Sequence, residues 1–91
     1  GQRFRAPHFV ILYRPGCTAR SRVGITVSRR VGNAVIRNRV KRWVREFSRQ
    51  NMGLWPTVWD YVVIARPSAG RIEHPVVDRE LRAFFDHLGT R

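Results

Sequence analysis

Residues 33–50 read NAVIRNRVKRWVREFSRQ, and the spacing of their apolar side chains decides how the rest of the chain must fold. Large apolar side chains recur at intervals of three and four residues, which is typical of a helix with one buried face. Asn33 suits the N-cap position, and Met52-Gly53 and Pro56 indicate where the helix ends. The sequence therefore predicts a helix from about residue 33 to residue 50. Its apolar stripe consists of Ile36, Val40, Trp43, Val44 and Phe47.

The opposite side of this predicted helix is almost uniformly cationic. At about 100° per residue, the positions farthest from the stripe are Asn38, Arg42, Arg45 and Arg49, flanked by Arg37, Arg39 and Lys41. Residues 29–49 contain eight cations and one acid, Glu46. A solvated helix face usually mixes both signs of charge, and cations in the first two turns oppose the helix dipole by about 0.3–1 kcal/mol each. We therefore interpret this side as a nucleic-acid-binding surface.

The turn before the helix, residues 28–33, adds a second basic segment with Arg29 and Arg30. It leads into a helix N-terminus, where backbone N–H groups can hold a phosphate. Gly32 either allows a ligand to approach closely or only permits a positive φ in a tight turn. The sequence leaves both interpretations open.

Three other segments have strand patterns. Phe9 to Tyr13 is a short apolar run that ends at Pro15-Gly16. Residues 23–28 alternate, with Val23, Ile25 and Val27 on one face and small side chains on the other, which leaves room for a ligand or for a packed helix. Residues 59–65 are apolar on both faces apart from Asp60, so we expect a central strand.

A last helix is predicted from Pro75 to Gly89 by the spacing of its apolar residues and by Gly89 as its terminator. The predicted order is strand, strand, helix, strand, helix. This order indicates an α/β or α+β fold in which helices pack on a small sheet.

Composition limits the class of partner. The 91 residues carry a formal net charge of +12, which favours a polyanionic partner. No apolar run reaches the roughly 20 residues that span a bilayer, so nucleic acid is a better candidate than a membrane. The excess of Arg over Lys suits phosphate contacts, although a GC-rich genome would produce the same bias. A single cysteine, Cys17, excludes an intrachain disulfide and favours the cytoplasm.

Residues 27–42, VSRRVGNAVIRNRVKR, closely resemble the signature of the bacterial ribonuclease P protein, including its Arg-Asn-Arg core at residues 37–39. The flanks are similar as well: FVILY at residues 9–13, RVGI at 22–25 and DYVVIAR at 60–66. The resemblance covers nearly all of the chain, which we treat as one RNA-binding domain spanning residues 1–91.

The resemblance implies a fold and a function. The family has a small, mainly antiparallel four-stranded sheet with a left-handed βαβ crossover, similar to domain 2 of ribosomal protein S5, so a short fourth strand is expected around Phe4. Its members assist a catalytic RNA that uses Mg²⁺ to remove the 5′ leader from precursor tRNA, and they supply no catalytic group. They are subunits of an endoribonuclease that matures tRNA, with ribonuclease P RNA and precursor tRNA as partners.

The resemblance also implies site residues. By position, the side chains expected to face RNA are Arg29, Arg30, Asn33, Arg37, Asn38, Arg39, Lys41, Arg42, Arg45 and Arg49. Phe9, Leu12 and Tyr13 lie in the strand that floors the family's leader-binding cleft. Family members usually begin with a helix that covers one sheet face, and we expect this chain to start after it. An uncovered face of this kind would favour self-association.

Other functions fit the sequence less well. A protein-only nuclease needs clustered carboxylates for its metals, yet the acids are scattered, and His8, His74 and His87 have no ligand spacing. A ribosomal or general RNA-binding protein fits fold and charge equally well, and the Arg-Asn-Arg signature is what argues against it. Duplex DNA readout favours a more mixed set of polar side chains. Membrane binding would place large apolar residues beside the cations rather than opposite them.

Overall fold

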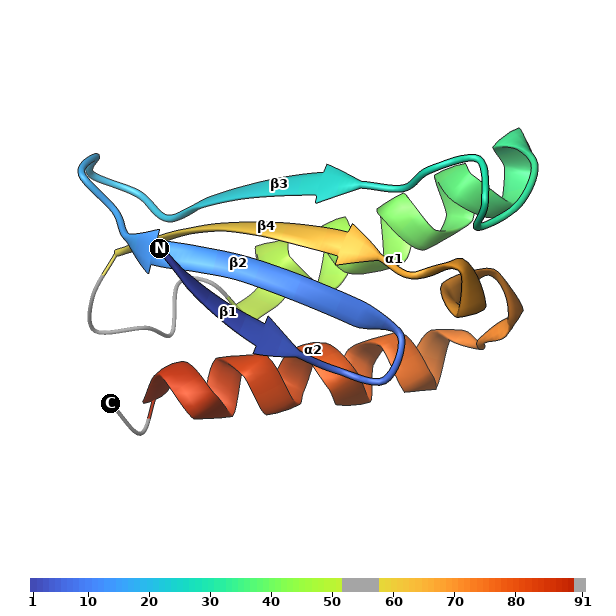
Figure 1. Cartoon of the computed structure of the whole chain (residues 1–91). Helices are drawn as coiled ribbons and strands as arrows, with labels where there is room; N and C mark the ends of the chain where they lie inside the picture. Colours follow the sequence, from blue (N-terminus) through green and yellow to red (C-terminus); the bar gives the residue numbers. More distant parts are fainter. Residues whose placement is uncertain (52–57, 90–91) are drawn as a thin grey trace.

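Two helices back one face of a four-stranded sheet in the computed structural model (Figure 1). The structure describes residues 1–51 and 58–89. The strands are β1 (Gln2–Arg5), β2 (Phe9–Pro15), β3 (Arg22–Thr26) and β4 (Trp59–Ala65); the helices are α1 (Ala34–Asn51), the short 3-10 helix η2 (Pro67–Arg71) and α2 (His74–Gly89). The predicted helices and strands are confirmed, including the short strand around Phe4. The predicted stop at Met52-Gly53 and Pro56 lies outside the described residues.

The sheet has the order β1-β2-β4-β3, so β4 is a central strand, as its two apolar faces predicted. β2 pairs antiparallel with β1 and with β4, whereas β3 pairs parallel with β4. The sheet is therefore mainly antiparallel, with one parallel pair joined through α1.

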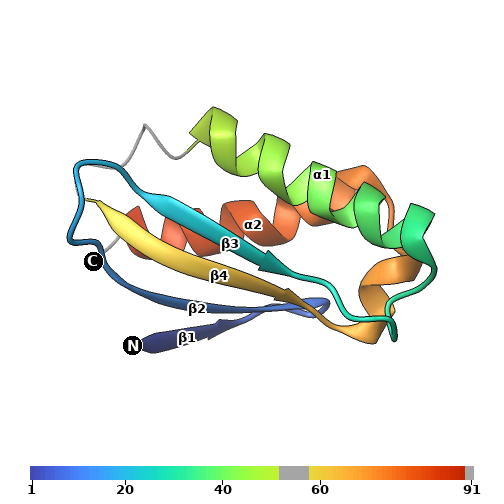
Figure 2. The same cartoon turned by 90° about the horizontal axis from the view of Figure 1, so that it is seen from above.

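The crossover through α1 is left-handed. In Figure 1, β3 and β4 both point to the right, β4 lies below β3, and α1 lies behind the sheet; Figure 2 shows the same arrangement from above. About 98% of such connections are right-handed. The α+β fold that the resemblance implied is thus confirmed, while the likeness to ribosomal protein S5 stays a prediction.

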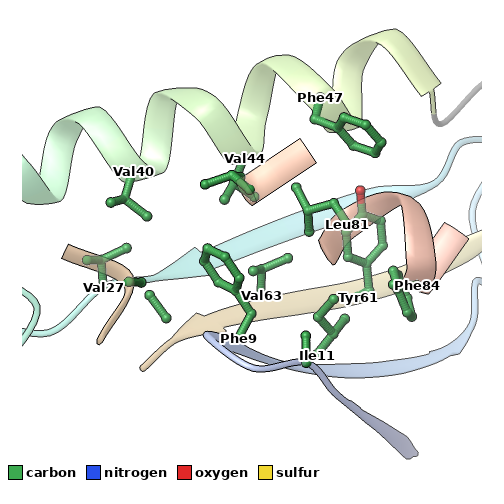
Figure 3. Packing of buried hydrophobic residues seen from close by; sticks show 14 of the residues in the cluster. Phe9, Ile11, Val27, Val40, Val44, Phe47, Tyr61, Val63, Leu81 and Phe84 are labelled. Carbon is green, nitrogen blue, oxygen red and sulfur yellow. The ribbon is translucent and has the colours of Figure 1, made fainter. Parts of the chain in front are cut away.

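The core lies between the sheet and the helices (Figure 3). Phe9, Ile11 and Val63 project from the sheet and are 0% exposed. Val40 and Val44 of α1 are equally buried against them, as the 3.6-residue periodicity predicted. Burial of such side chains contributes about 1.5–3 kcal/mol each, so the orientation of α1 follows from its apolar stripe.

A buried carboxylate ties the β1–β2 turn to α2. Glu80 is 4% exposed, and its Oε1 accepts a hydrogen bond of 2.8 Å from the backbone N–H of His8. Its Oε2 contacts His8 Nδ1. Because a buried carboxylate needs such partners, this contact fixes the turn on the helix. His8 therefore has a structural role.

Candidate nucleic-acid interface

Asn33 caps the N-terminus of α1. Its Oδ1 accepts a hydrogen bond of 3.0 Å from the backbone N–H of Ile36, and its backbone carbonyl accepts one of 2.9 Å from Arg37 N–H. Asn33 is thus the N-cap that the sequence predicted, and the cap fixes where the helix starts. Its proposed contact with RNA stays a prediction.

Gly32 is required by a close contact inside the protein. A Cβ at this position would lie 2.9 Å from Ile36 Cγ2, nearer than such atoms approach one another. The residue has a positive φ of 158° as well. The glycine therefore lets the turn close against the first helical turn, while Arg29 and Arg30 on the same turn are exposed.

The polar side of α1, which we call the cationic face, consists of Arg37, Asn38, Arg39, Lys41, Arg42, Arg45 and Arg49. Asn38, Arg42, Arg45 and Arg49 are exposed, and the flanking Arg37, Arg39 and Lys41 are half-buried. These residues lie on the side predicted from the helical period. They follow one helix of 18 residues, so their charges form a continuous stripe.

This stripe has little internal neutralisation. Among the described residues, the acid that approaches the cationic face is Glu46, whose Oε1 lies 4.0 Å from Arg42 Nε. The Arg42 side chain remains 62% exposed, so the pair is a weak surface contact. Unbalanced cations on a rigid helix are the arrangement that a phosphate backbone recognises.

Trp43 belongs to the predicted apolar stripe and lies at its border with the cationic face. It is half-buried and packs against the core cluster. The Arg39 guanidinium carbon lies 5.2 Å from the centroid of its ring, and the His74 imidazole stacks on it at 5.0 Å. The stripe position that the sequence predicted is therefore confirmed, and the ring meets α2, which starts at His74.

The second surface is the sheet face that no described helix covers, which we call the open sheet face. Strand register brings its side chains into rows: Arg3-Leu12-Val62-Gly24, Arg5-Val10-Ile64-Thr26 and Arg14-Asp60-Arg22. Leu12 and Val62 are 37% and 38% exposed. Apolar side chains thus occupy the middle of the face, and arginines lie around them.

A groove of about 440 Å³ lies on the open sheet face and is lined by Leu12, Val62 and Gly24, with Arg14, Arg22 and Asp60 at one end. Gly24 has no side chain, and this leaves space in the groove. A Cβ at this position would occupy part of that space, at 3.4 Å from Val62 Cγ2. The sequence left open whether this space serves a ligand or a helix. No helix among residues 1–51 and 58–89 fills it.

Two of the three cleft candidates have their side chains on the core side of the sheet, and a contact of any of the three with the leader stays a prediction. Phe9 is 0% and Tyr13 4% exposed, because both point to the core side of β2. Leu12 and Tyr13 both line the groove, and of the two Leu12 is the one on the open sheet face. The register Ile11↔Val63 decides this, since it places alternate residues of β2 on the core side.

One ion pair closes the end of the groove. Arg22 donates to Asp60 through Nε at 3.1 Å and through Nη2 at 2.7 Å. These hydrogen bonds and the charge of Arg22 lower the pKa of Asp60, and the same contact raises the pKa of Arg22. Sequence inspection missed this pair, since its members are 38 positions apart.

The remaining reactive side chains do not gather into a site. No group of three His, Cys, Asp or Glu residues that could hold a metal ion occurs in the described part of the chain. Cys17 is an exposed thiol, and His87 Nε2 lies 3.1 Å from the Tyr13 hydroxyl. No described helix is long and apolar enough to cross a membrane.

Comparison with known proteins is consistent across sequence and structure. Residues 1–89 match the family model described as Ribonuclease P. The ribonuclease P protein component of Geotalea uraniireducens is 41% identical over 87 residues, which cover 96% of this chain and 76% of that protein. The solved ribonuclease P protein of Thermotoga maritima superposes with a TM-score of 0.81 at 36% identity, covering 100% of this chain and 84% of that one. The Staphylococcus aureus protein gives a TM-score of 0.83 at 27% identity over 96% of this chain and 80% of that one.

Proposed function

Since the chain belongs to the ribonuclease P protein family, we propose that it is the RNA-binding subunit that assists ribonuclease P RNA in removing the 5′ leader from precursor tRNA in the cytoplasm. The observation that supports this most strongly is the cationic face, which presents its charges on one helix with a single neighbouring acid among the residues that the structure describes. A ribosomal or general RNA-binding role would use the same charges, but the family match does not favour it.

In this proposal the cationic face binds the phosphate backbone of the RNA subunit. Each neutralised phosphate releases condensed counterions, so affinity falls steeply with salt. Arginine suits this role because its planar guanidinium donates two hydrogen bonds to one phosphate. Arg29 and Arg30 extend the same contact along the turn before α1.

The leader strand is proposed to lie along the open sheet face. Its groove combines apolar side chains with arginines at the margins, which fits a single strand whose bases and phosphates need different surroundings. Leu12 is the residue of the predicted cleft set that remains available for a base. Phe9 and Tyr13 support the floor from the core side.

The cleavage chemistry is assigned to the RNA subunit together with Mg²⁺. The described residues of the protein do not form a metal site of their own. Their part is to neutralise phosphates and to hold the leader. Both effects would lower the Mg²⁺ concentration that the RNA needs to fold and to bind its substrate.

Reconstitution tests the proposal. The protein is added to a bacterial ribonuclease P RNA made in vitro, and cleavage of precursor tRNA is followed at low Mg²⁺. We expect strong stimulation of cleavage by the protein and no cleavage by the protein alone. Lack of stimulation across RNA subunits from several bacteria would contradict the proposal, and cleavage without RNA would reassign the chemistry to the protein.

Self-association is a further part of the proposal. The exposed Leu12 and Val62 form an apolar centre that a second copy would bury when no leader is bound. Light scattering at increasing protein concentration should then show a dimer that dissociates when single-stranded leader RNA is added. A monomer at all concentrations would refute this part without affecting the rest.

A further inference from the structure

Arg39 differs from the other cations of α1 in how it is held. Its Nε, like that of Arg37, is buried and has no hydrogen-bond partner within residues 1–51 and 58–89. What distinguishes Arg39 is that its guanidinium carbon lies 5.2 Å from the centroid of the Trp43 ring. Arg42, by comparison, is 62% exposed and has Glu46 as its neighbour. Arg39 is thus positioned by an aromatic ring, and Arg42 by a weak ion pair.

The indole is itself held by α2. The His74 imidazole stacks on Trp43 with a centroid separation of 5.0 Å and an interplanar angle of 6°. His74 Nε2 lies 3.4 Å from Asp78 Oδ1, one helical turn further along α2. The contacts therefore run from Asp78 through His74 and Trp43 to Arg39. They connect the first turn of α2 to the cationic face of α1.

We propose that Trp43 and His74 are positioning residues for RNA binding: they hold the Arg39 guanidinium in the orientation in which it meets a phosphate. This inference rests on the proposed function, because it requires that Arg39 contacts RNA. It adds two residues, one of them on α2, to an interface otherwise confined to α1 and its preceding turn.

The physical reason is preorganisation. A long arginine side chain loses rotamer freedom when it binds, and a surface that already restricts the side chain reduces that loss. The face of an indole attracts a guanidinium without neutralising its charge. A carboxylate would restrict Arg39 equally well but would compete with the phosphate. A stacked tryptophan therefore orders Arg39 and leaves its charge available.

A double-mutant cycle tests the link between Arg39 and Trp43. Binding of the full chain to a bacterial ribonuclease P RNA is measured for Arg39→Ala, Trp43→Leu, Trp43→Phe and the combination of Arg39→Ala with Trp43→Leu. We expect roughly fivefold weaker binding for Arg39→Ala and about two- to fivefold for Trp43→Leu, the range of an exposed cation–π contact. Trp43→Phe, which keeps an aromatic face, should stay within about twofold of wild type.

The combined variant should bind no more weakly than Arg39→Ala alone, because Trp43 acts through Arg39. Arg42→Ala with Trp43→Leu is the matched control. Adjacent residues on a helix do not face each other, so those two effects should add. Circular dichroism and thermal melting establish that each variant is folded at the temperature of the binding measurement.

His74 is tested by two substitutions. His74→Phe keeps a flat ring against the indole, whereas His74→Ala removes it. We expect RNA affinity close to wild type for the first variant and about a twofold loss for the second. A purely structural role would lower the melting temperature of His74→Ala without changing its affinity below that temperature.

The outcomes separate the two proposals. If the wild-type protein binds no ribonuclease P RNA, the proposed function fails. If the wild type binds and Arg39→Ala binds equally well, or if the Trp43 and Arg39 effects add, the positioning role is refuted and the proposed function stands. Coupling between residues 39 and 43, with additivity between 42 and 43, establishes the role.

Discussion

The cationic face of α1 and the open sheet face use arginine in opposite ways. On α1 the arginines project from one helix, Glu46 is the one acid nearby in the described part of the chain, and apolar side chains lie on the other side. On the sheet the arginines surround exposed Leu12 and Val62, and Arg22 is bound to Asp60. The first arrangement suits a phosphate backbone of any sequence. The second suits a strand whose bases must be accommodated together with its phosphates.

The comparison suggests a division of labour between two surfaces of one small protein. Both surfaces depend on the same core, because Val44 of α1 and Val63 of the sheet lie in a single buried cluster. A change on one surface should therefore alter one kind of RNA contact and leave the other intact.

The largest effect is expected on the cationic face. Changing Arg39 and Arg42 together to Ala should weaken binding to the RNA subunit roughly 30-fold, because each loses a hydrogen bond to phosphate that contributes about 1 kcal/mol at the solvent-accessible surface. The slope of log Kd against log salt concentration should decrease by about 1.5, which is the contribution of two phosphates. The melting temperature should change by less than about 4 °C.

Arg71→Ala with Arg79→Ala is the charge-matched control for this variant. Both side chains are exposed and lie outside α1. Equal losses of affinity in the two double variants would mean that only net charge matters, and the distinction between the surfaces would be lost.

The next effect concerns the start of α1. Asn33→Ala removes the hydrogen bond to Ile36 N–H and should destabilise the protein by about 1 kcal/mol. In thermal melts this corresponds to a decrease in the melting temperature of about 4–8 °C. Asn33→Ser should restore most of the stability. If Asn33→Ser regains stability but not RNA affinity, the side chain also contacts RNA, as the family resemblance implied.

A smaller effect is expected when the groove of the open sheet face is filled. Gly24→Val places a side chain beside Val62, while Gly24→Ala fills less of the space. Gly24→Val should weaken binding of precursor tRNA about threefold, which corresponds to less free energy than the burial of one apolar side chain contributes. Gly24→Ala should weaken this binding less. Binding of mature tRNA, which has no leader, should not change. Equal losses for both tRNAs would show that the groove does not hold the leader.

The smallest effect should come from Asp60→Asn. Because the pKa of Asp60 is lowered by Arg22, the pair stabilises the folded state above the ordinary carboxyl pKa of about 3.9. This stabilisation is lost as the pH falls through the lowered value. The variant should melt below wild type by about 4 °C or less at pH 7, with a constant difference down to about pH 5. The two proteins should converge in more acidic buffer, and a difference that grows there would contradict the assignment.

The sequence was most informative where one period dominates. The spacing of Val40, Val44 and Phe47 oriented α1 correctly, since an apolar stripe at helical spacing has one way to be buried. β4 was recognised as central because both of its faces are apolar. The charge of the cationic face followed directly from the same helical geometry.

Features that depend on packing between distant segments were not predictable. In the run FVILY every residue is apolar, so the run does not indicate which residues face the core. The pairing with β4 decides this and buries Phe9 and Tyr13. Likewise, the helical spacing placed Trp43 on the apolar stripe, but the stacking of His74 of α2 on its ring depends on a segment 31 positions away and was not predictable.

Site-specific crosslinking tests the division of labour most directly. With Cys17 changed to Ser, a photoreactive group is attached at a cysteine that replaces Arg45 on the cationic face or Leu12 in the groove. Each protein is then bound to the RNA subunit together with precursor tRNA. We predict that the group at position 45 crosslinks to the RNA subunit and the group at position 12 to the leader. A label at position 45 that reaches no RNA, while the complex still forms, would contradict the account.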